Sequence, residues 1–304
     1  WTNNNTFQAR NATVTMEAAT QGETIAASSS DFYNLTFNGS GGWTWQDVNA
    51  TITQNFVIDS GTVTSTSGNL SVGGDFENNS GVFNHASGTV RLFSTSSQSI
   101  SSNGSAFYNL TFNSTGGEWQ FASGNHDVDH DFTILQGVVT STSGTLYVGG
   151  DWQNNDTFVA NSGTVTFDAD ETGHTIDTGG ELFNIVTFDN SSGGWTVLSD
   201  ATSTNNWNLT AVSQFTATSG ITIEVNGEFH NTLSSGNTTW SGATLFLNSG
   251  SDYTINTKAT TTGDQYATLK IGQNTDIRMW NSLVSTDYDI DSSASLYSMD
   301  HNQS

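Results

Sequence analysis

Short runs of alternating apolar and polar residues recur along the whole chain. The runs are rich in Thr, Val and Phe, and Gly, Ser and Asn separate them. Such alternation is typical of half-buried β-strands, and no stretch has a convincing helical pattern. The sequence therefore predicts an all-β fold. The apolar pairs between residues 107 and 182 are Leu110 and Phe112, Trp119 and Phe121, Phe132 and Ile134, Leu146 and Val148, and Val165 and Phe167.

The strand pattern belongs to a long internal repeat. FYNLTFNGSGG at 32–42 returns as FYNLTFNSTGG at 107–117, and GTVTSTSGNLSVGGDF at 61–76 returns as GVVTSTSGTLYVGGDW at 137–152. The aromatic residues that mark one phase of the repeat are Trp1, Phe76, Trp152 and Phe229, which gives a period of about 76 residues. The units are roughly 1–75, 76–151, 152–228 and 229–304, with 266–304 degenerate and either a cap or the start of another unit.

Each unit divides at SG or GG turns into stretches of about 19 residues. A stretch this short cannot bury an apolar face alone, but it can if it forms a coil on which the next coil stacks. We therefore predict a single right-handed parallel β-helix over residues 1–304, in which both FYNLTF copies occupy the same position of a coil. Leu35, Phe37, Leu110 and Phe112 then point inward, and Asn34, Thr36, Asn109 and Thr111 point outward. An array of β-sandwich domains is the competing fold, and the absence of Pro favours the coils.

Two strings carry a resemblance to a known class of proteins. LSVGGDFENNSGVF at 70–83 and SGTVRLF at 87–93 resemble the parallel β-helix repeats of large secreted microbial surface proteins. The coils also look like those of filamentous-haemagglutinin-type adhesins, and the resemblance covers about residues 1 to 265. It implies an extracellular rod that adheres, spaces or polymerises. Pectate-lyase-like enzymes share the fold.

Charge narrows the choice of partners. The net charge is −24 with only five Lys and Arg residues, so the basic clusters that bind nucleic acid or anionic membranes are lacking. No apolar run approaches the roughly 18 residues of a membrane span, and the chain has no Cys for disulfides. It begins at Trp1 without Met or a signal peptide, which suggests a processed chain or a piece of a longer one.

The segment NHDVDHD at 125–131 is the strongest candidate for chemistry. On a helix, His126 and His130 would lie one turn apart, as zinc ligands do. The repeat places the segment on a strand, where the two histidines are about 13 Å apart, so we predict no zinc site. Asp127 and Asp129 then point outward, and Asp289 and Asp291 repeat the arrangement near the C-terminus. These four aspartates are candidate Ca²⁺ ligands; the alternative is a solvated acidic surface.

Sugars are the remaining candidate ligands. Trp43, Trp45, Trp119 and Trp195 follow GG corners and are candidate sugar platforms, with packing in the core as the alternative. A lyase needs a basic residue beside Ca²⁺-binding acids, and no Arg or Lys is near the 125–131 segment in sequence. A hydrolase needs two facing carboxylates.

Candidate N-glycosylation sites are Asn34, Asn38, Asn78, Asn109, Asn113 and Asn237.

The sequence thus predicts a non-enzymatic structural or adhesive rod at the cell surface. Five of the first seven residues match the repeat that starts at Trp152. We therefore expect head-to-tail continuity with copies of the chain or with adjoining repeats of a longer chain, with surface glycans as further partners. A carbohydrate-binding or carbohydrate-degrading β-helix protein is the alternative.

Overall fold

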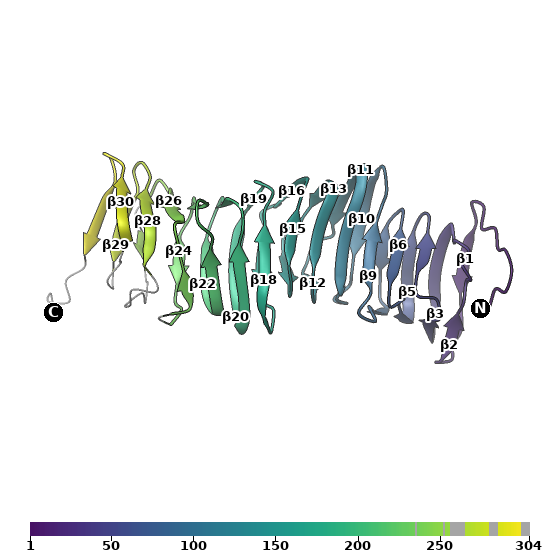
Figure 1. Cartoon of the computed structure of the whole chain (residues 1–304). Helices are drawn as coiled ribbons and strands as arrows, with labels where there is room; N and C mark the ends of the chain where they lie inside the picture. The colour runs from purple at the N-terminus through teal and green to yellow at the C-terminus, as the bar shows by residue number, and fades with distance from the viewer. Residues whose placement is uncertain (235, 252, 256–264, 280–284, 299–304) are drawn as a thin grey trace. The chain divides into compact units, whose positions relative to one another are not determined.

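The computed structural model describes residues 1–304 except 235, 252, 256–264, 280–284 and 299–304. The described residues form β-strands and no helix, and the strand pairs with known register are parallel. The chain divides into two compact units, one of Trp1–Tyr147 with Asn155–Val159 and one of Val148–Asn154 with Ala160–Ser304. Each unit is a parallel β-solenoid (Figure 1). The all-β parallel β-helix is confirmed, and the β-sandwich alternative is wrong.

The strands of the first unit follow one another with short corners between them. They are β1 (Thr13–Met16), β2 (Glu23–Ile25), β3 (Asn34–Trp45), β4 (Ala50–Ile52), β5 (Phe56–Thr64), β6 (Asn69–Val72), β7 (Phe76–Asn78), β8 (Val82–Asn84), β9 (Thr89–Leu92), β10 (Ser97–Ser101), β11 (Asn109–Phe121), β12 (His126–Val128), β13 (Phe132–Thr140), β14 (Thr145–Val148) and β16 (Thr157–Val159). β14 ends at the boundary between the units.

The second unit is built in the same way. Its strands are β15 (Trp152–Asn154), β17 (Thr164–Phe167), β18 (Thr172–Asp177), β19 (Leu182–Phe183), β20 (Ile185–Val197), β21 (Ala201–Ser203), β22 (Trp207–Ala217), β23 (Thr222–Val225), β24 (Phe229–Asn231), β25 (Thr238–Thr239), β26 (Thr244–Leu247), β27 (Tyr253–Ile255), β28 (Tyr266–Ile271), β29 (Asp276–Met279), β30 (Ser285–Ile290) and β31 (Ser295–Ser298).

The core of the first unit consists of columns of inward residues, each standing on its register partner in the coil before. Because parallel pairing keeps register, an apolar residue meets an apolar residue at every level. Column 1 is Val14, Leu35, Phe56, Phe76 and Ile100. Column 2 is Trp43, Val63 and Phe83. Column 3 is Ala50, Leu70, Val90, Leu110 and Phe132.

The inward and outward assignment from the sequence is confirmed. Leu35, Phe37, Leu110 and Phe112 are fully buried, and each buried side chain of this size stabilises the fold by about 1.5–3 kcal/mol. Their polar neighbours Asn34, Thr36, Asn109 and Thr111 are only half-buried. The second unit has the same kind of column, in which Val165, Val186, Trp207 and Phe229 stand in register.

The two FYNLTF copies do not share a coil position, contrary to the prediction. Leu35 lies in column 1, and its counterpart Leu110 lies in column 3. From Leu35 the chain passes Phe56, Phe76 and Ile100, which is three complete coils, before it reaches Leu110. One repeat therefore contains three coils and a fraction, so division of its length by four gave too short a coil.

The coils are accordingly longer than predicted, and they differ in length. The number of residues between the two partners of a hydrogen bond that joins successive coils gives the coil length directly. The bond from Asn69 N–H to the Asn49 side chain spans 20 residues, and the bond from the Asn78 side chain to the Ser102 carbonyl spans 24 residues. Val72 pairs with Leu92 and Phe76 pairs with Ile100, so the additional residues of the longer coil lie between β9 and the paired part of β10.

One corner recurs with the same backbone in three repeats. Both of its central residues have positive φ, for example 49° and 75° at Asn103 and Gly104, and Ser105 N–H donates to the Ser102 carbonyl at 3.0 Å. These features define a type I′ turn, which favours Asn-Gly and Gly-Gly. The three central pairs are Ser28 with Ser29, Asn103 with Gly104, and Gly179 with Gly180.

Candidate functional site on the first unit

The His- and Asp-rich segment begins as strand β12 and alternates as the sequence predicts. His126 and Val128 are buried, Asp127 is half-buried, and Asp129 is exposed. Strand geometry therefore sends the two aspartates to the surface and directs His126 into the core, away from His130. The two imidazoles are therefore not directed at one another, and the absence of a zinc site stays a prediction.

His126 is a hydrogen-bonded core residue. Its Nε2 lies 3.0 Å from the Ala122 carbonyl oxygen, and its Nδ1 lies 3.0 Å from the Ser102 hydroxyl. A carbonyl only accepts, so Nε2–H donates to Ala122 and Nδ1 accepts from Ser102. Burial lowers the pKa of His126, and the bond to Ala122 opposes this shift. The ring is therefore neutral in the folded protein at pH 7.

Two other histidines stack on a tyrosine at the surface of successive coils. The Tyr108 ring lies 4.9 Å from the His130 ring at an angle of 14°, and 5.4 Å from the His85 ring at 31°. His130 N–H also donates to the Tyr108 carbonyl at 3.0 Å. Because both faces of Tyr108 are covered by imidazoles, the ring has no free face on which a sugar could stack. We call His85, Tyr108 and His130 the imidazole stack.

Carboxylates flank the imidazole stack. His85 Nε2 lies 2.9 Å from Asp129 Oδ2, and His130 Nδ1 lies 3.0 Å from Asp131 Oδ1. Burial raises the pKa of Asp127, the charge of Asp129 adds to the effect, and His85 opposes it. Asp129 thus has a histidine partner, while the surroundings of Asp127 disfavour its charge.

The candidate calcium ligands fall into two separate places. Asp127 and Asp129 belong to the first unit, and Asp289 and Asp291 belong to the second. Within the described ranges, no group of three or more His, Asp or Glu residues is arranged to hold a metal ion. Calcium binding by the two pairs stays a prediction.

Asp289 and Asp291 lie at the end of strand β30. Asp289 Oδ2 is 4.0 Å from Lys270 Nζ, and the same ammonium group lies 4.6 Å from the centre of the Phe246 ring. Asp291 accepts hydrogen bonds from the backbone and hydroxyl of Ser293, and these bonds lower the pKa of Asp291. The fold therefore supplies Asp289 with a basic neighbour that is distant in sequence.

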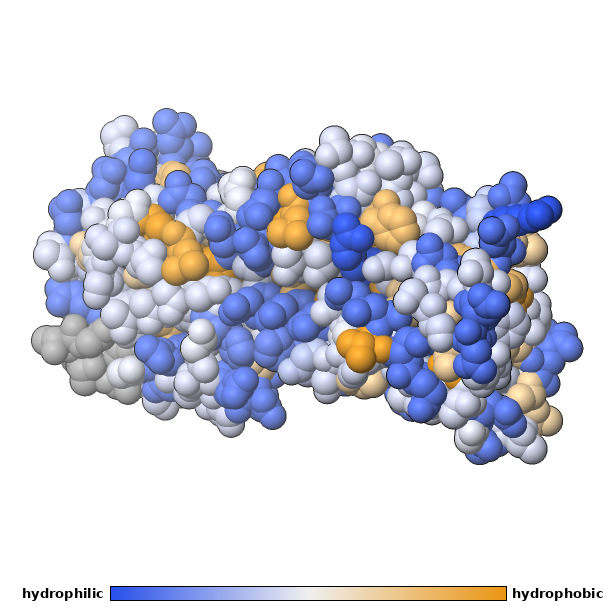
Figure 2. Space-filling model, turned by 45° about the vertical axis from the view of Figure 1, so that its right-hand side comes forward, coloured by the Kyte–Doolittle hydropathy of each residue, from blue (hydrophilic) through white to orange (hydrophobic). Residues whose placement is uncertain are grey.

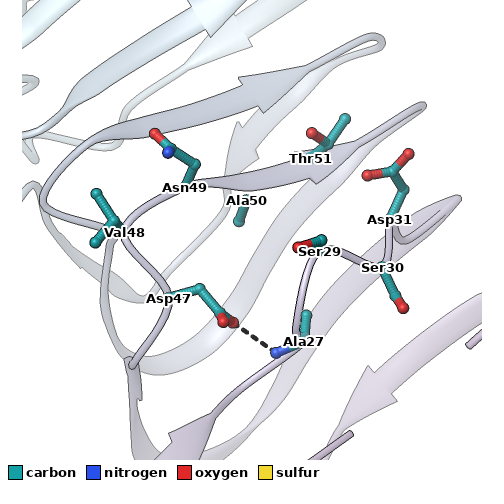
Figure 3. A pocket seen from close by; sticks show the side chains of 9 residues that line it. All are labelled: Ala27, Ser29, Ser30, Asp31, Asp47, Val48, Asn49, Ala50 and Thr51. Atoms are coloured by element: carbon teal, nitrogen blue, oxygen red, sulfur yellow. Dashed lines mark hydrogen bonds between the residues drawn. The ribbon is translucent and has the colours of Figure 1, made fainter. Parts of the chain in front are cut away.

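A polar hollow lies at the corner formed by Ser28 and Ser29 (Figure 3). Asp47 enters it, and its carboxylate accepts the N–H groups of Ala27 at 2.5 Å and Ser28 at 3.3 Å. Asp31 lies on the opposite side of the hollow. Because the Asp47 carboxylate binds backbone amides, it serves to hold the left-handed corner in place.

The tryptophans proposed as sugar platforms are core residues. Trp43, Trp45, Trp119 and Trp195 are at most 5% exposed. Their rings pack against inward phenylalanines, as Trp119 does on Phe112 at 5.3 Å. The packing alternative is therefore correct for all four.

The candidate glycosylation sites differ in accessibility. Asn38 is exposed, and Asn34, Asn109, Asn113 and Asn237 are half-buried. Asn78 is 1% exposed, and its Nδ2 donates to the Ser102 carbonyl and the Ser105 hydroxyl, both at 3.1 Å. The folded chain has no room for a glycan on that nitrogen, so the prediction is wrong for Asn78.

Asn78 instead represents a structural feature that the sequence reasoning missed. In the first three repeats, an asparagine two positions after the aromatic residue that marks the repeat reaches the corner of the next coil with its side chain. The donors and carbonyl acceptors are Asn3 to Ala27, Asn78 to Ser102 and Asn154 to Thr178, at 3.2, 3.1 and 3.0 Å. We call these residues the clamp asparagines. Their fixed spacing from the aromatic residue was visible in the sequence.

Comparison with known proteins gives no further identification. No protein-family model, no curated protein and no solved structure matches this chain. The resemblance to secreted surface proteins therefore rests on the quoted strings and on the parallel β-solenoid fold. Among the described residues, no helix is long and apolar enough to cross a membrane.

Proposed function

We propose that this chain is an extracellular structural or adhesive β-solenoid whose coils continue head to tail into coils of another copy or of adjoining repeats. The observation that carries the proposal is an uncovered core surface on strand β30 in the second unit. Polar, acidic outer surfaces and the resemblance to secreted surface proteins support the location outside the cell.

The uncovered surface continues two buried columns. Leu269 and Ile271 on β28 are fully buried, whereas their register partners Tyr288 and Ile290 on β30 are 43% and 39% exposed. Because Tyr288 and Ile290 occupy the positions of β30 that pair with inward residues of β28, a coil stacked on β30 would bury them. β30 is also an edge strand among the described residues, and free backbone groups at an edge recruit further strands.

The first unit offers the matching kind of edge. Strand β1 pairs in parallel with β3, and its inward residue Val14 is only half-buried. Because the coils pair in parallel, a second copy can extend β30 with β1 without reversing direction. Figure 2 shows mostly polar residues with scattered apolar ones on the face in view, which favours contact through the coil edges over contact through that face.

Sedimentation velocity over a range of concentrations tests the stacking. We expect the unmodified chain to self-associate and Ile290→Lys to abolish this, because a charge at an inward position prevents burial of the edge. Thr286→Lys places the same charge at an exposed position of β30 and should keep the association. A chain that is monomeric at every concentration would overturn self-stacking.

Protease treatment of intact source cells tests the location, since protection of the chain until lysis would contradict it.

One observation favours the alternative of a carbohydrate-degrading protein. Lys270 beside Asp289 provides the acid and base pair that a polysaccharide lyase needs. Ultraviolet detection of unsaturated products from acidic polysaccharides tests this function. Activity lost in Lys270→Met and kept in Arg278→Met would support it, and no activity on any acidic polysaccharide would count against it.

A further inference from the structure

The sequence contains three Asn-Gly pairs, at Asn38, Asn103 and Asn226. The side-chain amide of an asparagine can be attacked by the backbone nitrogen of the next residue, and glycine hinders this attack least. The fold treats the three pairs differently. Two are held in place by neighbouring coils, and one lies at an open corner.

We propose that Asn103-Gly104 is a site of intramolecular deamidation that converts Asn103 to aspartate and isoaspartate. Asn103 is exposed at the type I′ corner, and a Cβ on Gly104 would meet no atom within 4 Å. Within the part of the chain that the structure describes, no hydrogen bond engages the Asn103 side chain or the Gly104 N–H. The reacting groups are therefore free to approach each other.

The reaction needs only water as a co-reactant. The Gly104 nitrogen gives up its proton and bonds to Cγ of Asn103, and the bond from Cγ to the amide nitrogen breaks. The released nitrogen leaves as ammonia with that proton, and a succinimide ring remains. Water then opens the ring at either carbonyl, which yields aspartate or isoaspartate. Because the attacking nitrogen must lose its proton, the rate rises with pH.

The other two pairs are protected by the fold. Asn226 Nδ2 donates to the Ser203 carbonyl at 3.2 Å, and Gly227 N–H donates to the Asn205 carbonyl at 3.2 Å. Both reacting groups of that pair are thus occupied. Asn38 and Gly39 lie inside strand β3, where a Cβ on Gly39 would be 2.3 Å from a backbone oxygen of the coil before. Ring closure there requires the strand to leave the sheet.

The product changes the charge of a defined surface. Asn103 and Gly104 line the same hollow as Asn84 and His85, a member of the imidazole stack. Deamidation adds a carboxylate to this hollow, and isoaspartate also lengthens the backbone at the corner. The consequence is an irreversible, time-dependent modification confined to one corner of the first unit.

Peptide mapping of the aged full-length chain tests the proposal. After incubation in mildly alkaline buffer, we expect deamidation at Asn103 to be at least about tenfold faster than at Asn38 or Asn226, a difference of about 1.4 kcal/mol in the barrier. In denaturant, where the fold protects nothing, the three rates should converge. Equal rates at the three sites in the folded chain would overturn the proposal.

Matched variants keep the test independent of local sequence. Asn103→Ser should abolish isoaspartate formation in the folded chain, as detected by enzymatic methylation of isoaspartate. Serine fits this turn, because Ser28 occupies the equivalent corner with φ 50°. Asn226→Ser should leave the methylation signal unchanged. A signal that survives Asn103→Ser would place the modification elsewhere and contradict the assignment.

Discussion

The clamp asparagine Asn78 offers the sharpest test of how the coils are held together. Replacement with aspartate changes one NH₂ group to an oxygen and keeps the shape of the side chain. Oδ1 can still accept from Gly81 N–H at 2.9 Å. The second oxygen, however, faces the Ser102 carbonyl, to which the amide of Asn78 donates.

The expected loss follows from these contacts. Two donated hydrogen bonds disappear, each with a net value of about 1 kcal/mol, while the Ser102 carbonyl keeps the N–H of Ser105 as a donor. We therefore expect Asn78→Asp to lower the free energy of unfolding by at least about 2 kcal/mol at neutral pH, with a buried carboxylate adding to the loss.

Urea unfolding followed by tryptophan fluorescence measures the effect. Asn38→Asp makes the same chemical change at an exposed site and should shift the free energy of unfolding by less than about 0.5 kcal/mol. Burial raises the pKa of the new carboxyl in the folded state, so the deficit should shrink as pH falls and the protonated form donates to Ser102. Equal losses in the two variants, or a deficit independent of pH, would refute the clamp.

Four further predictions concern the core, a corner, a buried histidine and calcium. Leu110→Asp should lower the free energy of unfolding in urea by more than about 4 kcal/mol, because it buries a charge. Thr111→Asp should lower it only slightly, because its register partner is Arg91. Similar losses in the two variants would contradict the assignment of inward and outward faces. Ser29→Gly should raise the melting temperature, because glycine removes the strain of a side chain at φ 67°. The net gain in stability should be about 0.5–1 kcal/mol once the larger entropy loss of glycine on folding is subtracted. A lower melting temperature would count against this account. Because the pKa of His126 is lowered in the folded state, the unfolded chain takes up a proton first as pH falls below about 6.5. The free energy of unfolding should therefore decline below that pH, and urea titrations at several pH values should show a smaller decline for His126→Gln. The same dependence of stability on pH in both proteins would exclude the mechanism. Millimolar calcium should raise the melting temperature more than magnesium does if the four candidate aspartates bind it, and a chelator-treated sample with the same value would show that they do not.

The strands were predictable from the sequence because their signal is local. Alternation around Leu110 and Phe112 depends only on which side chains can enter a dry core, and the structure buries both. The same logic predicts that Asp129 points outward, and Asp129 is exposed. Glycine and asparagine likewise marked the corners, since positive φ is least costly for them.

The contacts between coils were harder to predict because they depend on coil length. The sequence shows the spacing of repeats, but it does not show how many coils one repeat contains. The hydrogen bond from Asn78 to Ser102 spans 24 residues, and the contact between Lys270 and Asp289 likewise joins register partners on successive coils. Without the register, neither partner can be chosen from the sequence, and the triplet at Asn78 predicts a glycosylation site instead.

The imidazole stack shows what this geometry means for function in a repeat protein. His85, Tyr108 and His130 are neighbours in space because each lies one coil, and not one repeat, from the next. The residue one repeat before His130 is Gln54, whose N–H donates to the Tyr33 carbonyl just as His130 N–H donates to Tyr108. The backbone scaffold is thus copied, while the side chains on it differ. Each repeat ends on a different face of the coil from the one on which it began. Residues that stack on one another at the surface of successive coils therefore come from different positions of the repeat. Surface chemistry can therefore diverge from one coil to the next while the repeat preserves the core.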